Sequence, residues 1–349
     1  MKETVAEEFW EIIKNEKRSV VILGTGDAGE KLFRLLKKNN VRTSAFASSD
    51  EFLRNRSFLG YKVLSLKRVK EIFGDDTVLL MGFGSHKKEV ISRVVDLSRE
   101  FDLYMPDLMT DSEGNPTTRS LLKRDEEKYR WAYSLLEDER SREVFRKSLE
   151  YRVSGRIEPL LDINSSPEEA WDLLGGGEGE TLLDGGAYDG DTISIFMSKY
   201  SSWKEIYGIE PSIRAYRKLE EKYGGRDNIH LYNGALSNEV GETGFAMGHG
   251  RGNHIGEGRI VPLYTVDSIL NGKEATILKY DIEGAEREGI IGARKTIEQY
   301  KPRIILSAYH RFDDFHSLLS LIWSIRSDYK VYMRKSMSLP LWDVEYILV

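Results

Sequence analysis

The strongest chemical signal in this 349-residue chain is a glycine-rich turn that carries several carboxylates. The run from Leu182 to Thr192 begins with apolar residues and continues into glycines, which indicates a strand, a turn and the start of a helix. Gly186 and Gly190 allow the backbone to approach a ligand closely, and the start of a helix offers free N–H groups. Asp184 adds a negative charge at the tip of the strand. The pattern predicts a ligand site here.

A second acidic residue follows at the spacing of a ribose-binding site. Glu210 closes the next expected strand, twenty residues beyond Gly190, where a doubly wound sheet places a carboxylate that accepts hydrogen bonds from ribose hydroxyls. A pyrophosphate would be repelled by Asp184, Asp189 and Asp191, whereas a ligand with a sulfonium and an ammonium group would be attracted. The turn therefore favours S-adenosylmethionine over NAD, with a purely structural tight turn as the alternative.

Four further polar side chains follow two later strands. They are Asp281, Glu283, Tyr309 and His310. Because ligands of open α/β sheets lie beyond the carboxyl ends of the strands, we expect the four to converge on one rim. His310 is the first candidate for a general base, since an ordinary histidine pKa near 6.5 suits proton transfer at neutral pH, and Glu283 is the second. The alternatives are a structural His310 and an Asp281 that only orients the amine of the cofactor.

Histidine spacing argues against a metal site. The carboxylates Asp281 and Glu283 could join His249, His254 and His310 around a divalent cation, but no two histidines keep the i, i+4 spacing of a helical ligand pair. We therefore expect no metal.

The segment from Gly244 to Gly258 contains six glycines and several polar side chains. The polar residues are His249, Arg251, Asn253 and His254. The segment is either an acceptor loop that closes over the pocket or a glycine-rich hairpin.

A separate glycine motif stands near the N-terminus. Gly24, Gly26 and Gly29 form a GxGxxG pattern after a strand and before a helix, with Asp50 twenty-one residues further on, which is the context of a nucleotide site. No Ser-Tyr-Lys catalytic set follows, so we favour acceptor binding or interaction over an independent enzyme. This segment, with Gly60–Leu64, resembles the N-terminal Rossmann-like domains of sugar O-acyltransferases.

Two series of alternating strands and helices must position these residues, and such alternation predicts parallel sheets. In the first series a strand that begins at Ser19 leads into the glycine turn, further strands are expected at 41–47 and 77–81, and helices at 30–39, 66–73 and 86–97. In the second series the strands are 181–184, 205–210, 230–233, 276–281 and 303–308, with a helix over 285–300. A charged amphipathic helical segment, broken near Asp138, spans 123–152 between the two.

Composition excludes several classes of function. The net charge of −6 offers no field for nucleic acid, and the absence of cysteine removes disulfides, thiol nucleophiles and cysteine-held metal centres. No apolar run approaches the roughly 20 residues of a membrane span. The acidic start, with Val5, Phe9, Ile12 and Ile13 at helical spacing, predicts a docked helix rather than a signal peptide. We expect a soluble, cytoplasmic protein.

Taken together, motifs over Leu135–Val349 resemble the FkbM family of S-adenosylmethionine-dependent methyltransferases. In chain order they are Asp184–Thr192, Gly208–Pro211, Asn233–Ser237, Thr265–Asp267, Lys279–Glu286, Lys301–Pro302, Ser307–His310 and Tyr329–Arg334. The resemblance implies a cofactor site made of Asp184, Gly186, Ala187, Tyr188, Gly190, Asp191, Glu210, Asn233, Ala235 and Asp281. In that site Glu210 would hold the ribose, and Asn233 with Ala235 would border the adenine. The resemblance also implies that Asp281 and Glu283 sit at the mouth of the pocket, and the candidate catalytic residues remain His310, Glu283 and Asp281.

The predicted architecture is α/β, with two Rossmann-like doubly wound domains joined by a helical segment. We place an N-terminal Rossmann-like domain at 1–118, a helical linker or cap at 119–178, and a class I methyltransferase fold at 179–349. The resemblance implies O-methylation of a hydroxyl on a sugar, glycan or polyketide-like acceptor. The alternatives are an NAD(P)-dependent sugar-nucleotide oxidoreductase and a non-catalytic nucleotide-binding scaffold. We expect a small-molecule or glycan acceptor and neither nucleic acid nor membrane as partner, and the sequence leaves a homo-oligomer open.

Overall fold

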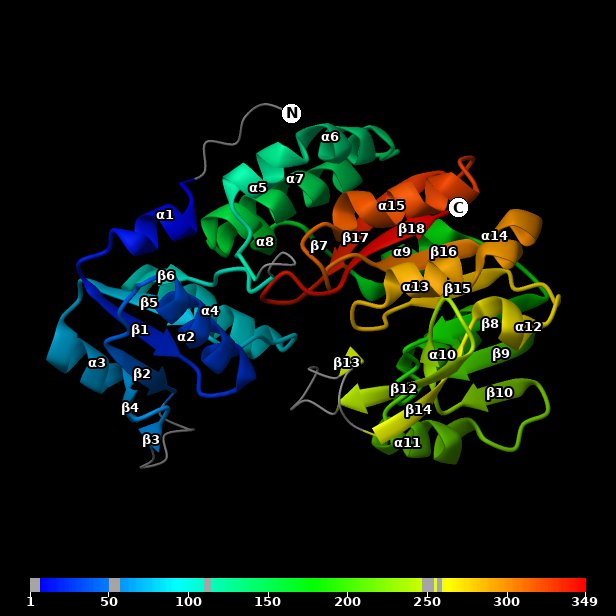
Figure 1. The fold of residues 1–349 in the computed structure, drawn as a ribbon, viewed down its shortest axis with the longest axis horizontal. Coiled ribbons are helices and arrows are strands. Elements are labelled where there is room, and N and C mark those ends of the chain that lie inside the picture. The colour runs from blue at the N-terminus through cyan, green and yellow to red at the C-terminus, as the bar shows by residue number, and fades with distance from the viewer. Residues whose placement is uncertain (1–6, 50–56, 110–113, 247–253, 256–258) are drawn as a thin grey trace. The chain divides into compact units, whose positions relative to one another are not determined.

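The computed structural model describes residues 7–49, 57–109, 114–246, 254–255 and 259–349, with only the backbone described at 245–246 and 254–255. The chain is a mixed α/β protein with parallel sheets (Figure 1), which confirms the predicted fold class. It divides into two compact units, and neither is one continuous stretch of sequence. Unit 1 contains 1–130, 142–165 and 335–343, and unit 2 contains 131–141, 166–334 and 344–349.

Unit 1 is built on a sheet with strand order β3-β4-β2-β1-β5-β6, in which the five strands from β4 to β6 run parallel. Its elements up to the sheet's last strand are α1 (Phe9–Lys14), β1 (Ser19–Leu23), α2 (Asp27–Lys38), β2 (Ala45–Ser48), β3 (Ser57–Phe58), β4 (Tyr61–Ser65), α3 (Leu66–Phe73), β5 (Thr77–Met81), α4 (Lys88–Glu100) and β6 (Asp102–Tyr104). They are followed by α5 (Arg119–Arg124), α6 (Glu126–Ser134), α7 (Glu139–Ser154), α8 (Glu158–Leu161) and β7 (Asn164–Ser165). Helices α6 and α7 each run from one unit into the other.

Continuous apolar runs explain the sheet of unit 1. Strand β5 is buried along its whole length and β1 along all but its first residue, as expected for parallel strands covered on both faces. Helix α1 adds Phe9, Trp10 and Ile13 to the same core, so the docked N-terminal helix is confirmed over Phe9–Lys14. Val5 lies outside the described residues.

Unit 2 carries a larger sheet with the order β10-β9-β8-β15-β16-β18-β17, and a small sheet with the order β11-β14-β12-β13. The first elements are α9 (Pro167–Leu174), β8 (Glu180–Gly185), α10 (Asp191–Lys199), β9 (Trp203–Ile209), α11 (Ile213–Tyr223), β10 (Ile229–Tyr232), β11 (Ala235–Leu236), β12 (Gly241–Ala246), β13 (His254–Ile255) and β14 (Arg259–Tyr264). The remainder are α12 (Val266–Leu270), β15 (Ile277–Tyr280), α13 (Glu286–Ile291), α14 (Arg294–Tyr300), β16 (Arg303–Ser307), α15 (Asp314–Ile325), β17 (Val331–Ser336) and β18 (Val344–Leu348). The last two residues of β17 belong to unit 1, where they pair with β7.

The five strands from β10 to β16 are parallel, so their carboxyl ends lie along one edge of the sheet. Strand β8 is buried throughout, and Leu182 and Ile277 of neighbouring strands pack in the same apolar core as Trp171 of α9. This core fixes the strand ends that carry the candidate site.

The expected second-series strands are confirmed to within a few residues, but the single helix predicted over 285–300 is wrong. The structure has α13 and α14, separated at Gly292 and Ala293. A side chain at Gly292 would collide with the carbonyl of Ser237, and Asp267 accepts hydrogen bonds from the backbone N–H groups of Lys295 and Thr296 at 3.0 Å each. The carboxylate of Asp267 thus satisfies the free N–H groups at the start of a new helix.

The expected break near Asp138 is confirmed, because α6 ends at Ser134 and α7 begins at Glu139. The pairing of β18, which runs antiparallel to β16, was not predicted. Among the described residues, no helix combines the length and the apolar character that crossing a bilayer requires.

Candidate functional site

The predicted site residues of unit 2 gather where β8, β9, β10 and β15 end. The glycine turn follows β8, Glu210 follows β9, Asn233 follows β10, and Asp281 follows β15. Since these strands are parallel neighbours, one edge of the sheet presents all four segments. His310 follows β16, the next strand of the same edge.

The glycines of the turn are required by the protein's own packing. Gly186 has a φ of +80° and Gly190 a φ of +82°, a region that side-chain-bearing residues rarely adopt. A Cβ on Gly186 would collide with the carbonyl oxygen of Asp281, and one on Gly190 would collide with the ring of Tyr223. The sequence interpretation, that these glycines make room for a ligand, therefore missed a structural reason that holds without any ligand.

Tyr188 lies in the middle of the turn in a strained conformation. Its φ is +46° and the residue is 56% exposed, so this part of the turn faces solvent. Ala187 is buried, and Asp191 is exposed in the first turn of α10. The N–H of Tyr188 donates a hydrogen bond of 2.9 Å to Oε2 of Glu210. Glu210 therefore holds this turn in place.

Glu210 is nearly buried, and each of its oxygens already accepts one backbone hydrogen bond. Oε1 accepts from the N–H of Ser212 at 2.7 Å, in addition to the bond from Tyr188. Burial raises the pKa of Glu210 to about 6, although both N–H donors act in the opposite direction. Each carboxylate oxygen can accept a second hydrogen bond, so the predicted contact to a ribose hydroxyl remains chemically available.

Asp184 is completely buried, and its charge is poorly compensated. Burial raises its pKa to about 6, with Lys279 acting against that rise. Within the part of the chain that the structure describes, no group donates a hydrogen bond to either oxygen, and Nζ of Lys279 lies 3.5 Å from Oδ1. A buried carboxylate without donors is costly, so this site favours an additional cation or hydrogen-bond donor.

Sequence reasoning did not identify Lys279 as a site residue. It stands beside Asp184 in the parallel register of β15 and β8, and the nearby charges of Asp184 and Asp281 raise its pKa against the effect of burial. The available signal was a lysine inside the otherwise apolar strand Ile277–Tyr280.

Asn233 joins two of the loops at this edge. Its amide Nδ2 donates to the carbonyl of Glu210 at 2.9 Å and to that of Pro211 at 3.2 Å. Ala235 is buried in β11, two residues further along the chain. The structure thus ties Asn233 to the Glu210 loop and buries Ala235 two residues beyond it.

The predicted catalytic residues form one charged cluster. Nε2 of His310 lies 3.5 Å from Oδ1 of Asp281 and 3.6 Å from Oε2 of Glu283. On the other side of the ring, Nδ1 forms an ion pair of 2.9 Å with Oε1 of Glu286. The hydroxyl of Tyr309 donates to Asp281 at 3.1 Å. The expected convergence of these side chains on one rim is present in the structure.

The raised pKa of His310 contradicts the expectation that it acts as a neutral base. Burial alone would lower its pKa, but Glu286, Asp281 and Glu283 outweigh burial and raise the pKa of His310 to about 10. Lys279 and His310 in turn hold the pKa of Asp281 below its usual range, although burial acts to raise it. At neutral pH the ring is an imidazolium, so the expected pKa near 6.5 is wrong for the protein without ligand.

Some predictions fall on residues about which little or nothing can be said. Asp50, His249, Arg251 and Asn253 lie outside the described residues, and the side chain of His254 in β13 does as well. In the described portion of the chain, no group of three or more acidic or histidine side chains is arranged to hold a metal ion.

The N-terminal glycine motif of unit 1 is tightly packed. Gly24 has a φ of +131°, and a Cβ there would lie 2.7 Å from the carbonyl oxygen of Gly82, which itself packs against Gly29. Gly26 precedes α2, and the exposed Asp27 opens that helix with a negative charge that repels phosphate. Close packing of β1, β5 and α2 accounts for Gly24 and Gly29.

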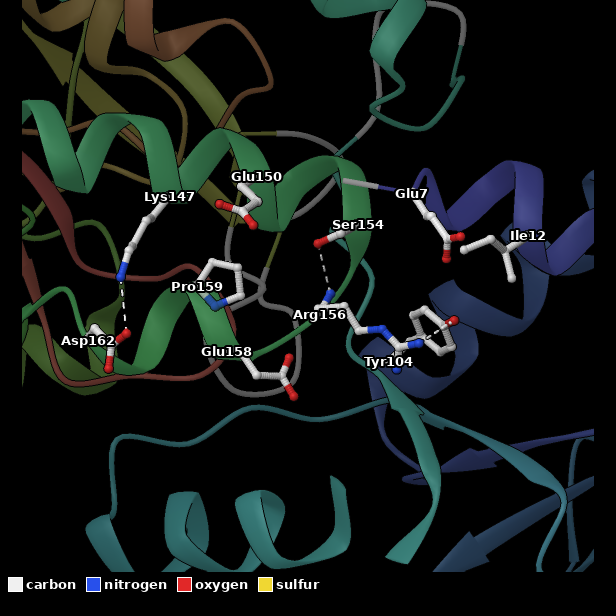
Figure 2. A pocket seen from close by; sticks show the side chains of 10 residues that line it. All are labelled: Glu7, Ile12, Tyr104, Lys147, Glu150, Ser154, Arg156, Glu158, Pro159 and Asp162. Carbon is white, nitrogen blue, oxygen red and sulfur yellow. Dashed lines mark hydrogen bonds and ion pairs between the residues drawn. The ribbon is translucent and has the colours of Figure 1, made fainter. Parts of the chain in front are cut away.

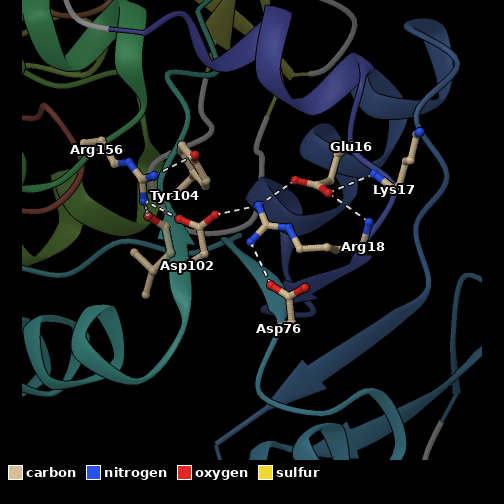
Figure 3. A network of polar contacts seen from close by, with 8 residues as sticks. Glu16, Lys17, Arg18, Asp76, Asp102, Tyr104 and Arg156 are labelled. Carbon is tan, nitrogen blue, oxygen red and sulfur yellow. Dashed lines mark hydrogen bonds and ion pairs between the residues drawn. The ribbon is translucent and has the colours of Figure 1, made fainter.

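Unit 1 also contains an open cavity of about 430 Å³, which none of these glycines lines (Figure 2). Its lining residues are Glu7, Ile12, Tyr104, Lys147, Glu150, Ser154, Arg156, Glu158, Pro159 and Asp162. Arg156 is already engaged, with bonds of 2.7 Å to Asp102 and 2.6 Å to the hydroxyl of Tyr104. Figure 3 shows that Asp102 also binds Arg18, so the guanidinium belongs to a structural network rather than to an anion site.

Comparison with known proteins found a similarity for part of the chain. A family model described as the methyltransferase FkbM domain matches residues 184–331. No curated protein matches the chain. The solved structure of methyltransferase FkbM from Methylobacillus flagellatus KT is 19% identical, with a TM-score of 0.76 over 95% of this chain and 90% of that one, which shows a shared fold.

A second solved structure is an rRNA methylase from Streptococcus thermophilus. It is 12% identical with a TM-score of 0.34, over 53% of this chain and 95% of that one, and this likeness is too weak to support an inference. The match to the family model covers the turn after β8, the loop after β9 and the Asp281 loop. Residues 184–331 therefore resemble the methyltransferase FkbM domain.

Proposed function

We propose that the chain is an S-adenosylmethionine-dependent methyltransferase that methylates a hydroxyl of a small-molecule or glycan acceptor, such as a sugar or a polyketide-like compound. The family match over 184–331 supports methyl transfer. The observation that carries the cofactor assignment is the buried Asp184 carboxylate, which lacks hydrogen-bond donors at the edge where the strands end.

The residues at this edge fit a ligand that is both cationic and rich in hydroxyls. Asp184 and Glu210 both have pKa values raised to about 6 because burial leaves their charges undercompensated. A neighbouring ammonium or sulfonium group would stabilise their charged forms. Asp184 is assigned to the charged part of the cofactor and Glu210 to its ribose, with Asn233 and Ala235 beside the adenine.

When bound, S-adenosylmethionine supplies an electrophilic methyl group for an in-line displacement. In the overall reaction the acceptor oxygen gains the methyl group, the carbon–sulfur bond breaks, and the hydroxyl proton goes to the protein. The protein side of this exchange is the coupled cluster of His310, Asp281 and Glu283.

The protonation states within that cluster determine which group can accept the hydroxyl proton. With His310 protonated and the pKa of Asp281 held below its usual range, a carboxylate of the cluster is the group with room for another proton. Tyr309 already donates to Asp281, and the Glu283 side chain is 39% exposed, which favours Glu283 as the first contact for the acceptor hydroxyl. Because the groups interact strongly, the proton is assigned to the cluster rather than to one atom.

A methyl-transfer assay tests the proposal. The purified full chain is incubated with S-adenosylmethionine carrying a radiolabelled methyl group and with panels of polyhydroxylated and amine-bearing acceptors. We expect label on a hydroxyl, with transfer reduced in Glu283→Gln and unchanged in Glu221→Gln, whose side chain is exposed on α11. Label found only on amines would contradict the hydroxyl assignment.

A further inference from the structure

Glu286 is a buried carboxylate that no part of the proposed function has used so far. It is the first residue of α13 and is only 1% exposed. Its Oε1 accepts hydrogen bonds from the N–H groups of Ile282 at 3.0 Å and Gly284 at 3.4 Å. The same oxygen lies 2.9 Å from Nδ1 of His310. One oxygen atom therefore contacts both the loop after β15 and the ring after β16.

The loop that Glu286 holds is strained at the residue that bears the exposed carboxylate. Glu283 has a φ of +55° and Gly284 a φ of +95°. A non-glycine residue persists in this conformation only where its surroundings enforce it. Besides Glu286, the guanidinium of Arg311 supports the loop by donating from Nε to the carbonyl of Gly284 at 2.7 Å. These contacts fix the direction in which the Glu283 side chain leaves the backbone.

The contact with Glu286 also determines which nitrogen of His310 faces the carboxylates of the rim. With Nδ1 turned toward Glu286, only Nε2 is left to face Asp281 and Glu283. The ring is also packed against Tyr309, with centroids 4.1 Å apart. An ion pair of this kind orients the imidazolium ring, whose two nitrogens both carry a proton in the charged form.

The charges around His310 come from four segments. The carboxylates of Asp281, Glu283 and Glu286 face the ring. Lys279 acts on Asp281 from β15. Beyond the ring, Arg311 pairs with Glu288 at 3.9 Å and Arg287 forms an ion pair with Asp313. Of these groups, Glu286 is the carboxylate in shortest contact with the imidazole.

We propose that Glu286 is a positioning residue for methyl transfer, because a single buried carboxylate fixes both the Glu283 loop and the His310 ring. This assignment rests on the proposed function. Glu286 does not touch the acceptor; it acts through His310 and through the backbone of 282–284.

The variant Glu286→Gln separates charge from hydrogen bonding. Its amide oxygen can still accept from Ile282 and Gly284, but the negative charge beside His310 is lost. We expect circular dichroism to show a folded protein and calorimetry to show S-adenosylhomocysteine binding within about twofold of the unmodified chain. Histidine NMR titration, with the His310 signal assigned from a His310→Gln sample, should show the pKa of His310 lowered by at least about one unit. Glu298→Gln, on α14, is the matched control and should leave that titration unchanged.

The outcomes of the two measurements are independent. A His310 titration that is the same in Glu286→Gln and in the unmodified chain overturns the positioning role, whether or not S-adenosylhomocysteine binds. If the unmodified chain does not bind S-adenosylhomocysteine, the proposed function is contradicted. The NMR titration still tests the contact between Glu286 and His310 in that case. If Glu286→Gln does not fold, the NMR titration of the unmodified chain is the test. A His310 that titrates near 6.5 overturns the proposal, and a His310 that is still protonated at pH 8 supports it.

Discussion

At the scale of single residues, the candidate site is a set of carboxylates whose charges the fold leaves partly uncompensated. Asp184 and Glu210 are buried with pKa values of about 6, while the buried His310 is held in its charged form by three carboxylates. Residue types and spacing predicted which side chains would take part. They could not predict the protonation states, because these depend on burial and on distances across strands that are remote in sequence.

The pKa values of Asp184 and Glu210 predict how binding depends on pH. Below about pH 6 both carboxylates become protonated, so a positively charged ligand loses its partners as the pH falls. We expect the affinity for S-adenosylhomocysteine to fall by about tenfold or more between pH 7.5 and pH 5. Calorimetry at both values measures this change. 5′-Methylthioadenosine, which lacks the ammonium group, is the control and should lose less; an equal loss for both ligands argues against the role of Asp184.

The raised pKa of His310 predicts a contribution to stability that is lost as the pH rises, whereas ligand binding weakens as the pH falls. Its folded-state pKa of about 10 exceeds the unfolded value of about 6.5, so its stabilising contribution is complete below pH 6.5 and is lost as the pH rises through 10. The melting temperature of the unmodified chain should therefore exceed that of His310→Gln clearly at pH 7 and by much less at pH 10. A difference that grows with pH would contradict the charged ring.

At the scale of elements, the strand ends were predictable and the details of the turns were not. Continuous apolar runs followed by glycines located β8 and the turn after it, and the polar residues after β15 and β16 followed from the same logic. The close approach of Gly186 to the backbone of Asp281 depends on the parallel register of β8 and β15. A single sequence does not reveal that register. The capping of α14 by Asp267 is likewise a tertiary contact.

Two glycines of unit 2 provide a matched test of the turn. Gly186 and Gly225 have similar φ values of +80° and +77°, but a Cβ on Gly225 would meet nothing within 4 Å, whereas one on Gly186 collides with Asp281. Gly225→Ala should cost about 1 kcal/mol from the backbone alone, and Gly186→Ala about 3 kcal/mol or more. Chemical denaturation of both variants compares them, and equal losses would show that the close approach of the two loops is not maintained.

At the scale of the whole molecule, the compact units interleave along the sequence. Unit 2 takes in 131–141 and 166–178 ahead of β8. In these segments Trp171 packs in the core, and Asp138 and Ser141 bind Arg334 of β17 at 2.7 and 2.9 Å. Contacts between segments that are far apart in the sequence leave no local pattern in it. Local patterns therefore predicted successive domains at 1–118, 119–178 and 179–349.

Truncation tests this interleaving. A fragment of residues 179–349 lacks α9 and the partners of Arg334, so we expect it to melt at a clearly lower temperature than a fragment of 131–349, or to remain insoluble. Thermal melts of the two fragments make the comparison. Equal melting temperatures would show that the segment ahead of β8 contributes no stability to unit 2.

The most direct measurement of the central claim is a calorimetric titration of the full chain with S-adenosylhomocysteine at pH 7.5. The unmodified chain and Glu221→Gln should bind with micromolar affinity, and Asp184→Asn and Glu210→Gln should each bind about tenfold more weakly or not at all. A cofactor site at the carboxyl ends of β8 and β9 would be contradicted if the unmodified chain did not bind S-adenosylhomocysteine, or if neither substitution changed the affinity.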